Sequence, residues 1–555
     1  MLSTGMLRFV VFLGIAARCI GADSTSVILI SVDTLRADHL SAYGYRRIRT
    51  PHIDALADHG TVYTRVESQI PLTLPSHTSL LTSTYPFENG IQENAQRVPP
   101  AMTLASVLKS QGYRTAAFIG SVFLESEMGL DQGFDLYDSP FHFEAFSPIS
   151  GSMFFGGLGR NPYTVRDRRD GALVLGAARR WLAANGSAPV FAFVHLFDLH
   201  QPYIRGGYDA ELAYVDKILG GFQQALVQSG MWQRSLVVFL SDHGEGLGEH
   251  GEDSHGYFIY ESTLWVPLII HWPGGAASRA ARNSQPAGLI DVAPTILDYL
   301  HVNPPSSFAG RSLLAGGGDE PVYSESVYAY DSFGWAPLRS IRQGAYKYID
   351  APRPELYDLH DDHGELNNLA SKEPARARVL ANELHALIVR HAPTQPATPG
   401  NIPPRTRALL ASLGYLSGGP KAANGSQPAD PKDKLYEYRL YERAQMALAR
   451  KQLQDAAVIL RQLLARDPHN LLARRDLGGT YVELKQYEKA RACFEDVVVA
   501  APDDYMAQFE LGVVYRRLGS FKEALEHLGA ACRLAPQAAQ CTKELEETRR
   551  ESGGR

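Results

Sequence analysis

Cysteine is scarce in this chain of 555 residues, with only four present and no Cys-x-x-Cys pair. Cysteine-ligated zinc modules and disulfide frameworks need closely spaced cysteines, so neither is expected. Positive charge is not in excess either, because 54 Lys and Arg residues stand against 60 Asp and Glu residues, for a formal net charge of −6. A nucleic-acid partner therefore has no electrostatic support.

The apolar run near the N-terminus is also short. Residues 9–17 are apolar, follow Arg8 and precede the small residues Gly21 and Ala22. This order predicts a signal peptide over residues 1–22, since a bilayer span needs about 20 apolar residues. An uncleaved anchor or a buried first strand is the alternative. We expect an extracytoplasmic protein, periplasmic or secreted, with no transmembrane anchor beyond this segment.

The overall composition is that of an ordinary globular protein, with 45% apolar residues. A chain of 555 residues is long enough for two to four domains. Continuous apolar runs, typical of strands covered on both faces, occupy residues 27–32, 190–194, 236–240 and 266–270. Helical patterns that alternate with them occupy residues 101–111, 171–185 and 209–229. The alternation predicts an α/β sandwich with a mixed or mostly parallel sheet over residues 23–392.

Residues 393–432 are rich in Pro and Gly and are predicted to form a linker, with a short helix at 405–416. A repeat region follows over residues 433–555. Asp467-Pro468, Ala501-Pro502 and Ala535-Pro536 lie 34 residues apart. This period resembles the tetratricopeptide repeat, which usually holds a protein or peptide partner. Three repeats are expected at 434–467, 468–501 and 502–535, with a closing helix at 537–550. Their cysteines, Cys493 and Cys532, are expected as buried thiols.

Polar residues follow or open the predicted elements at four places. Asp33 follows the first strand, where it either meets a cation or caps the next helix. Thr73 stands two residues before Pro75, which suits a helix start, and is either a nucleophile favoured by the helix dipole or a plain N-cap.

The other two places are richer in acids and histidines. Asp242 and His243 follow the strand at 236–240 in a Gly-rich stretch that also holds His255. Carboxylate plus imidazole suits a divalent ion such as zinc or manganese. His200 lies in the fourth stretch, after the strand at 190–194.

Together these stretches resemble a known family. SVDTLRADHLSAYGY, TLPSHTSLLTS, DLHQPY, SDHGEGLGEHG, YESTLWVPLIIHWPG, LIDVAPTILDYL and YKYI…ELYDLHDDHGELNNLA occur in the order of the sulfatase-like branch of the alkaline phosphatase superfamily. The resemblance implies a mixed-sheet α/β domain with a smaller C-terminal α+β portion, and hydrolysis or transfer of phosphate or sulfate esters at a metal-bound nucleophile.

The sequence departs from that family at four positions. Sulfatases have Cys or Ser where Thr73 stands, and oxidise it to formylglycine. Threonine is a secondary alcohol and gives a ketone, so that mechanism is closed here. Thr34 replaces a second Asp, His77 replaces an Arg, and His255 replaces a Lys. The chain is closer to the threonine-nucleophile members, the phosphodiesterases and phosphoethanolamine transferases, which have a further His twelve residues after the Asp-His pair, as His255 is.

By this resemblance Asp33, Thr73, Asp242 and His243 hold a divalent metal ion, with zinc preferred and manganese or calcium as alternatives. Thr73, His200 and His255 are the expected catalytic residues, and His77, His200 and His255 the expected contacts of the anionic ester. A second metal is not expected, because Asp198 and His200 have the wrong spacing. Glu245, Glu249 and Glu252 are expected to orient histidines or to remain solvated.

The sequence therefore predicts a metal-dependent phosphoester hydrolase, a phosphodiesterase or phosphatase, with Thr73 as covalent nucleophile. Three alternatives remain: a sulfuric-ester hydrolase, a phosphoethanolamine-type transferase, and a repeat scaffold over a degenerate catalytic domain. Hydrolysis is preferred to transfer because such transferases usually have transmembrane helices upstream.

Overall fold

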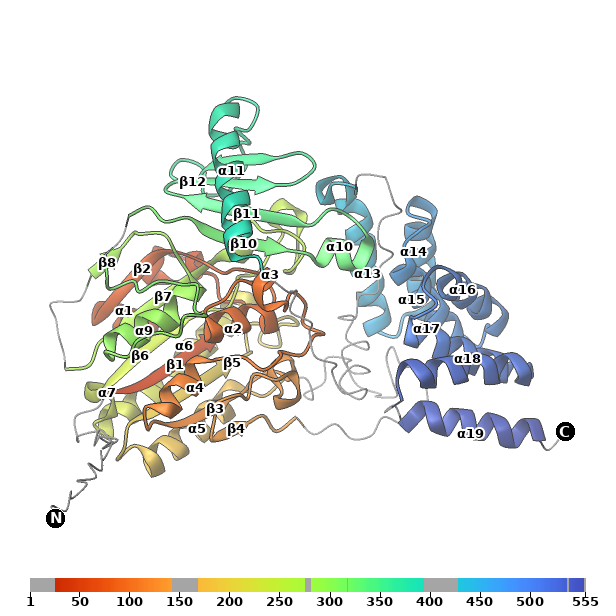
Figure 1. Cartoon of the computed structure of the whole chain (residues 1–555), viewed down its shortest axis with the longest axis horizontal. Helices are drawn as coiled ribbons and strands as arrows, with labels where there is room; N and C mark the ends of the chain where they lie inside the picture. Colours follow the sequence, from red (N-terminus) through yellow and green to blue (C-terminus); the bar gives the residue numbers. More distant parts are fainter. Residues whose placement is uncertain are drawn as a thin grey trace, which may run out of the picture.

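The computed structural model describes residues 25–141, 168–274, 281–316, 318–393, 428–536 and 539–553. They form an α/β body followed by a row of helices, blue in Figure 1. The predicted signal peptide and the predicted helix at 405–416 lie outside the described residues. Within the described ranges, no helix has the length and apolar character to cross a membrane.

A nine-stranded sheet lies at the centre of the α/β body, in the order β4-β3-β5-β1-β6-β7-β2-β8, with β9 beside β2. Its strands are β1 (Ser26–Val32), β2 (Gly60–Glu67), β3 (Arg114–Phe118), β4 (Leu136–Asp138), β5 (Val190–Leu196), β6 (Ser235–Leu240), β7 (Trp265–His271), β8 (Ala281–Asn283) and β9 (Ala287–Gly288). The strands from β4 to β6 are parallel, whereas β7 pairs antiparallel with both β6 and β2. The predicted mixed sheet is confirmed.

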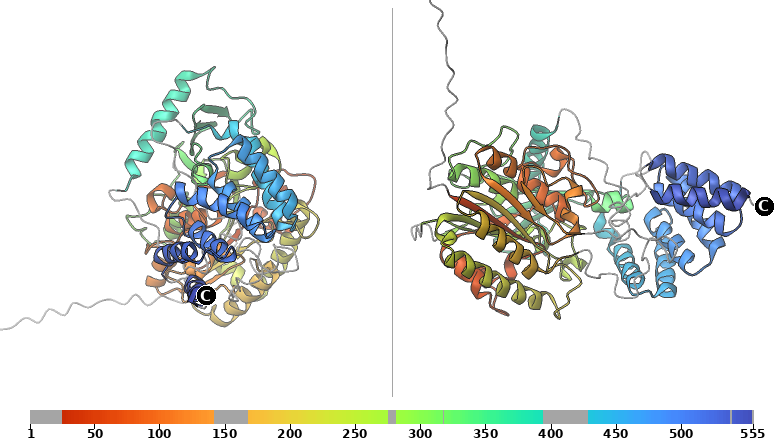
Figure 2. Two further views of the ribbon diagram at one scale, coloured as in Figure 1. Left: turned by 90° about the vertical axis from the view of Figure 1, so that its right-hand side faces the viewer. Right: turned by 90° about the horizontal axis from the view of Figure 1, so that it is seen from below.

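Helices cover both faces of this sheet (Figure 2). One face packs against α1 (Pro51–Asp58), α5 (Gly171–Asn185), α6 (Tyr208–Gln228) and α7 (Met231–Arg234). The other packs against α2 (Thr73–Thr82), α4 (Leu104–Ser110) and α9 (Val292–Tyr299). Burial on both sides explains why β1, β5 and β6 are mainly continuous apolar runs rather than alternating apolar and polar residues. The three predicted helices are confirmed as α4, α5 and α6.

A smaller antiparallel sheet follows, as the resemblance implied. It consists of β10 (Val322–Ser326), β11 (Leu338–Gln343), β12 (Tyr346–Asp350) and β13 (Glu355–Asp358), with α11 (Pro374–His391) packed on it. A buried ionic network joins it to the larger sheet. Arg342 Nη1 lies 2.8 Å from Glu67 Oε1 of β2, and Lys347 Nζ lies 3.1 Å from Glu261 Oε1. The described part of the α/β body also contains the short α-helices α3 (Pro86–Asn89), α8 (Glu261–Leu264) and α10 (Tyr328–Phe333).

The C-terminal region contains the three predicted helix pairs and a closing helix. They are α13 (Leu435–Ala449), α14 (Leu453–Arg466), α15 (Leu471–Glu483), α16 (Tyr487–Ala500), α17 (Tyr505–Arg517), α18 (Phe521–Leu534) and α19 (Ala539–Gly553). The repeated glycines lie where paired helices touch, since a Cβ on Gly478 falls 2.9 Å from the Phe494 ring and one on Gly512 falls 2.7 Å from Leu528. The domain limits drawn from the sequence remain predictions.

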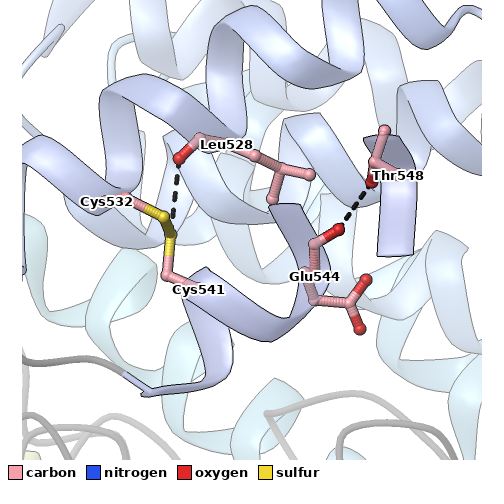
Figure 3. The surroundings of a disulfide bond; sticks show 5 residues. All are labelled: Leu528, Cys532, Cys541, Glu544 and Thr548. Carbon is pink, nitrogen blue, oxygen red and sulfur yellow. Dashed lines mark hydrogen bonds between the residues drawn. A yellow bond between two sulfur atoms is a disulfide. The ribbon is translucent and has the colours of Figure 1, made fainter. Parts of the chain in front are cut away.

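The cysteine expectation is wrong at one position. Cys532 of α18, expected as a thiol, forms a disulfide with Cys541 of α19, and their Cα atoms are 5.5 Å apart (Figure 3). The two cysteines are nine residues apart in sequence, and only the antiparallel return of α19 brings them together. Cys493 is free and partly buried.

We expect reduction of this disulfide, or Cys541→Ser, to loosen α19, because a short closed loop of this kind contributes about 2 to 3 kcal/mol. Limited proteolysis should then cut within 539–553 faster than in the oxidised protein. Cys493→Ser is the matched control and should leave the cleavage rate unchanged. Equal cleavage of oxidised and reduced protein contradicts the expectation.

Candidate active site

The polar residues predicted from the strand ends meet at one edge of the large sheet. Ser31 of β1 is in register with His195 of β5 and with Leu240 of β6, so the residues that follow these strands are neighbours. Asp33, Asp242 and His243 are fully buried there. Open α/β sheets place their sites at the carboxyl ends of the parallel strands, and this site follows that rule.

Thr73 lies at the same point, as the first residue of α2. Its hydroxyl donates to Asp33 Oδ2 at 3.2 Å, and its side chain is 1% exposed. The N-cap position of α2 is Leu72, so Thr73 does not cap the helix. Asn94 serves this helix end instead, since its Oδ1 accepts from the Leu74 N–H at 2.9 Å. The plain N-cap interpretation of Thr73 is therefore wrong.

Asp33 is not a helix cap either, because the next helical turn begins at Ala37 and Arg36 occupies its cap position. Thr34 follows Asp33 and stands where the family has a second acid. Its φ is 58°. Its N–H donates to Asp242 Oδ1 at 3.3 Å. This left-handed backbone turns the chain so that Asp33 and Asp242 face the same centre.

Three atoms at this centre are buried and have no hydrogen-bond partner among the residues that the structure describes: Asp33 Oδ1, Asp242 Oδ2 and His243 Nε2. One candidate ligand atom from each of these residues lies within 4.8 Å of the others. Burial raises the pKa of Asp33 to about 7 and also raises the pKa of Asp242. Two adjacent buried carboxyls with free oxygens fit a divalent cation, which would compensate both charges.

A second ligand group shares Asp242 with His77 and His195. Both nitrogens of His77 already have partners: Nε2 lies 2.9 Å from the Ser31 hydroxyl, and Nδ1 lies 2.7 Å from the Thr73 carbonyl. Burial lowers the pKa of His77 and of His195 to about 4, so both are neutral near pH 7. His77 was predicted to contact the substrate. In the structure its ring bonds to the backbone carbonyl of Thr73.

His200 and His255 lie beside the centre, with ring centroids 5.1 Å apart, and the His255 ring is 4.5 Å from that of His243. His200 Nδ1 donates to the Gln201 carbonyl at 2.6 Å, so its buried Nε2 is a free acceptor in the neutral ring. His255 Nδ1 lies 2.9 Å from Glu245 Oε1. Burial lowers the pKa of both rings, that of His255 to about 4.

Other predicted residues lie elsewhere. Asp198 accepts from the Gly171 N–H at 3.2 Å and lies 3.9 Å from Arg205, outside both ligand groups. Glu249 pairs with Arg36 at 2.9 Å, and Glu252 accepts the backbone N–H of Tyr257 at 2.8 Å.

Sequence reasoning missed His195, whose Nε2 lies 3.3 Å from Asp33 Oδ2. Its signal was a single imidazole inside an otherwise apolar strand. Asn94, which supports the start of α2, carries no local signal.

The chain belongs to the sulfatase family, a family of ester-hydrolysing enzymes that use a divalent metal. The Sulfatase family model matches residues 25–302, and the model for the C-terminal part of N-sulphoglucosamine sulphohydrolase matches residues 248–392. Two tetratricopeptide-repeat models match residues 447–511 and 507–537. The suspected sulfatase-like domain and its repeats are thereby confirmed.

Among similar proteins, arylsulfatase K of Bos taurus is 32% identical over 201 residues, which are 33% of this chain and 36% of that protein. The matched region thus spans about a third of that relative. An ulvan-active sulfatase of Formosa agariphila is 25% identical over 411 residues, 65% of this chain and 80% of that protein. The crystal structure of a phosphonate monoester hydrolase of Agrobacterium radiobacter is similar to this one with a TM-score of 0.54 and 22% sequence identity. The match covers 66% of this chain and 96% of the hydrolase chain, which shows a shared fold.

Removal of a bound metal ion should lower the stability of the folded protein, because the two buried acids would lose their counter-charge. We expect EDTA to lower the melting temperature and a divalent ion to restore it, measured by thermal shift with zinc, manganese and calcium. Asp242→Ala should abolish the response to metal, whereas Asp58→Asn, an exposed acid at the end of α1, should keep it. An unchanged melting temperature in all three ions contradicts the metal site.

The stability of the metal-free protein should change with pH in one direction. Burial raises the pKa of Asp33 to about 7 and that of Glu245 to about 8, so the folded state holds protons that the unfolded chain has lost. Stability should therefore fall as pH rises from 7 to 8, where the buried histidines are neutral. Urea unfolding at both pH values checks this, and a rise in stability over that interval contradicts it.

Proposed function

We propose that this protein is a metal-dependent hydrolase of phosphate esters, a phosphodiesterase or phosphatase, that uses Thr73 as a covalent nucleophile. One observation carries the proposal. The only hydroxyl of Thr73 points at Asp33, 3.2 Å away, at the centre where free oxygens of Asp33 and Asp242 and the free nitrogen of His243 converge. Zinc is our first choice of ion, since the donor set mixes carboxylate and imidazole.

Each residue has a role in this proposal. Asp33, Thr73, Asp242 and His243 would hold the ion, which when bound lowers the pKa of a hydroxyl and stabilises negative charge on an ester oxygen. Thr73 attacks phosphorus in line with the leaving oxygen, and the N-terminus of α2 stabilises the charge on the equatorial oxygens. His77 and Asn94 hold the backbone of the first turn in place.

The departing alcohol leaves on the side of His200 and His255. Both rings are neutral in the free protein because burial lowers their pKa. An anionic ester beside them favours the imidazolium form, so that one ring can give a proton to the leaving oxygen. Glu245, bonded to His255 Nδ1, orients that ring. Water then releases the group from Thr73.

Phosphate is preferred to sulfate for a chemical reason. Thr73 has one hydroxyl and, unlike a hydrated aldehyde, has no second hydroxyl to expel the bound group, so release needs attack on phosphorus or sulfur itself. A monoanionic sulfate gains less from the metal site than a phosphate does. Sulfate esters are the second candidate, supported by the sulfatase names of the relatives, arylsulfatase K and the ulvan-active sulfatase.

We further propose an extracytoplasmic location. The disulfide between Cys532 and Cys541 supports it, because structural disulfides persist in oxidising compartments. The repeats would bind a protein or peptide partner there.

We expect Thr73→Ala to lower kcat at least about 1000-fold on matched 4-nitrophenyl phosphate and sulfate esters, because the attacking atom is lost. Thr73→Ser should retain activity, since it keeps the hydroxyl. Thr84→Ala, two residues beyond the end of α2, is the control and should match the wild type. Substantial turnover by Thr73→Ala would falsify the nucleophile assignment.

A second prediction concerns the leaving group. His255→Gln should slow hydrolysis of alkyl esters about 100-fold but that of 4-nitrophenyl esters less than about tenfold, because nitrophenolate departs without a proton. The measurement is kcat/KM for both esters in wild type and variant. An equal loss on the two esters would show that His255 does not protonate the leaving oxygen.

A further inference from the structure

The loop between β6 and α8, residues 241–260, carries His255 and folds back on itself. The Gly246 N–H donates to the Ser254 carbonyl at 2.6 Å, which ties the two arms of the loop together. The contact between Glu245 Oε1 and His255 Nδ1, at 2.9 Å, joins the same two arms. The position of the His255 ring therefore depends on what holds these arms in place.

The tip of the loop is held by the first repeat helix. Arg439 Nε of α13 donates to the Gly251 carbonyl at 2.9 Å. Leu435 of the same helix is so near that a Cβ on Gly251 would fall 2.5 Å from its Cδ2. Gly251 also has a φ of 84°, a backbone conformation that favours glycine. The tip of the loop thus fits closely against α13 because residue 251 has no side chain.

The returning arm of the loop is held by the same helix. Tyr257 is fully buried, and its ring stacks on the Tyr438 ring of α13 with centroids 4.0 Å apart and planes inclined by 11°. The Tyr257 hydroxyl donates to the Pro431 carbonyl, just before α13, at 2.7 Å. Because His255 lies between Gly251 and Tyr257 in the chain, α13 holds the backbone on both sides of it.

The first repeat helix is itself fixed to the α/β body. The ring centroids of Tyr438 and Tyr441 lie 6.4 Å and 5.4 Å from that of Phe333 of α10, the helix beside α13 in Figure 1. Lys432 Nζ, in the turn that precedes α13, lies 2.8 Å from Glu355 Oε1 of β13. The helix can therefore serve as a fixed support for the loop.

The α/β body anchors the loop as well. The His250 ring stacks on that of Tyr260 with centroids 3.6 Å apart, and the Gly256 carbonyl accepts a hydrogen bond from the Ser326 hydroxyl. These contacts would remain if the contacts with α13 were lost. We therefore expect such a loss to displace the His255 ring rather than to unfold the loop.

We propose that Tyr438 and Arg439 of the first repeat helix are positioning residues for His255. The inference rests on the proposed role of His255 as proton donor to the leaving oxygen, and it gives the repeat region a part in that step. A catalytic group must be held within about 0.5 Å of its productive position, and the two contacts on either side of His255 restrict its movement. The repeat region is then part of the catalytic unit as well as a proposed binding module.

The test compares kcat/KM on alkyl and 4-nitrophenyl esters, since only the alkyl leaving group needs a proton. We expect Tyr438→Leu, which removes the stacked ring, to slow the alkyl ester about tenfold and the 4-nitrophenyl ester less than about twofold. Arg439→Ala should give a smaller change, about threefold, in the same direction. Tyr438→Phe keeps the ring and should retain the wild-type ratio, as should Arg461→Ala, the control, at an exposed position on α14.

A double variant separates positioning from general damage. In His255→Gln the proton donor is absent, so adding Tyr438→Leu should cost less than about a further twofold on the alkyl ester. Hydrogen exchange in a peptide spanning residues 251–257 should be faster in Tyr438→Leu than in wild type. If Tyr438→Leu does not fold, Arg439→Ala gives the same comparisons, because Arg439 is exposed.

The outcomes distinguish this inference from the proposed function. Equal losses on the two esters in the α13 variants, or a full further loss in the His255→Gln background, overturn the positioning role and leave the hydrolase function intact. Wild-type kinetics in both α13 variants overturn it too, because the α/β body then holds the loop unaided. If His255→Gln itself slows both esters equally, the proton-donor role and this inference fail together, while Thr73→Ala still tests the nucleophile. Failure of wild type to hydrolyse any of the esters removes the proposed function itself.

Discussion

The structure of the active site depends on one electrostatic constraint: Asp33 and Asp242 are buried side by side with free oxygens. A pair of carboxyls in this position must keep protons or share a cation. The parallel strands β1 and β6 deliver the two acids, and α2 presents Thr73 to the first of them. The fold therefore brings a hydroxyl and a site for positive charge to the same point, which is the minimum that nucleophilic ester chemistry needs.

The neutral histidines complement that constraint. His77 and His195 are held neutral by burial, so they add polarity around the acids without adding charge. His77 bonds the Thr73 carbonyl and the Ser31 hydroxyl, which ties the first turn of α2 to β1. In the family pattern a charged side chain stands there. Because a neutral, fully bonded imidazole stands there instead, a bound metal ion would be the main positive charge near the ester in the proposed mechanism.

Much of this was predictable from local sequence. Strand ends located Asp33, Asp242 and His243, and the 34-residue period located the three helix pairs. What escaped prediction depends on contacts between distant segments. His195 reaches Asp33 only through the register of β1 and β5, and Cys541 reaches Cys532 only after α19 turns back. Tyr438 and Tyr257 are 181 positions apart in the chain and stack on each other. A local sequence pattern cannot predict such a contact.

The most direct test of the central claim is mass spectrometry of the peptide that contains Thr73, after rapid acid quench during the first turnover of a 4-nitrophenyl ester. The account predicts a phosphoryl or sulfuryl group on the Thr73 hydroxyl, present in amounts that follow the burst of nitrophenol. The group found on another side chain, or a full burst of nitrophenol with Thr73 unmodified at every quench time, would contradict it.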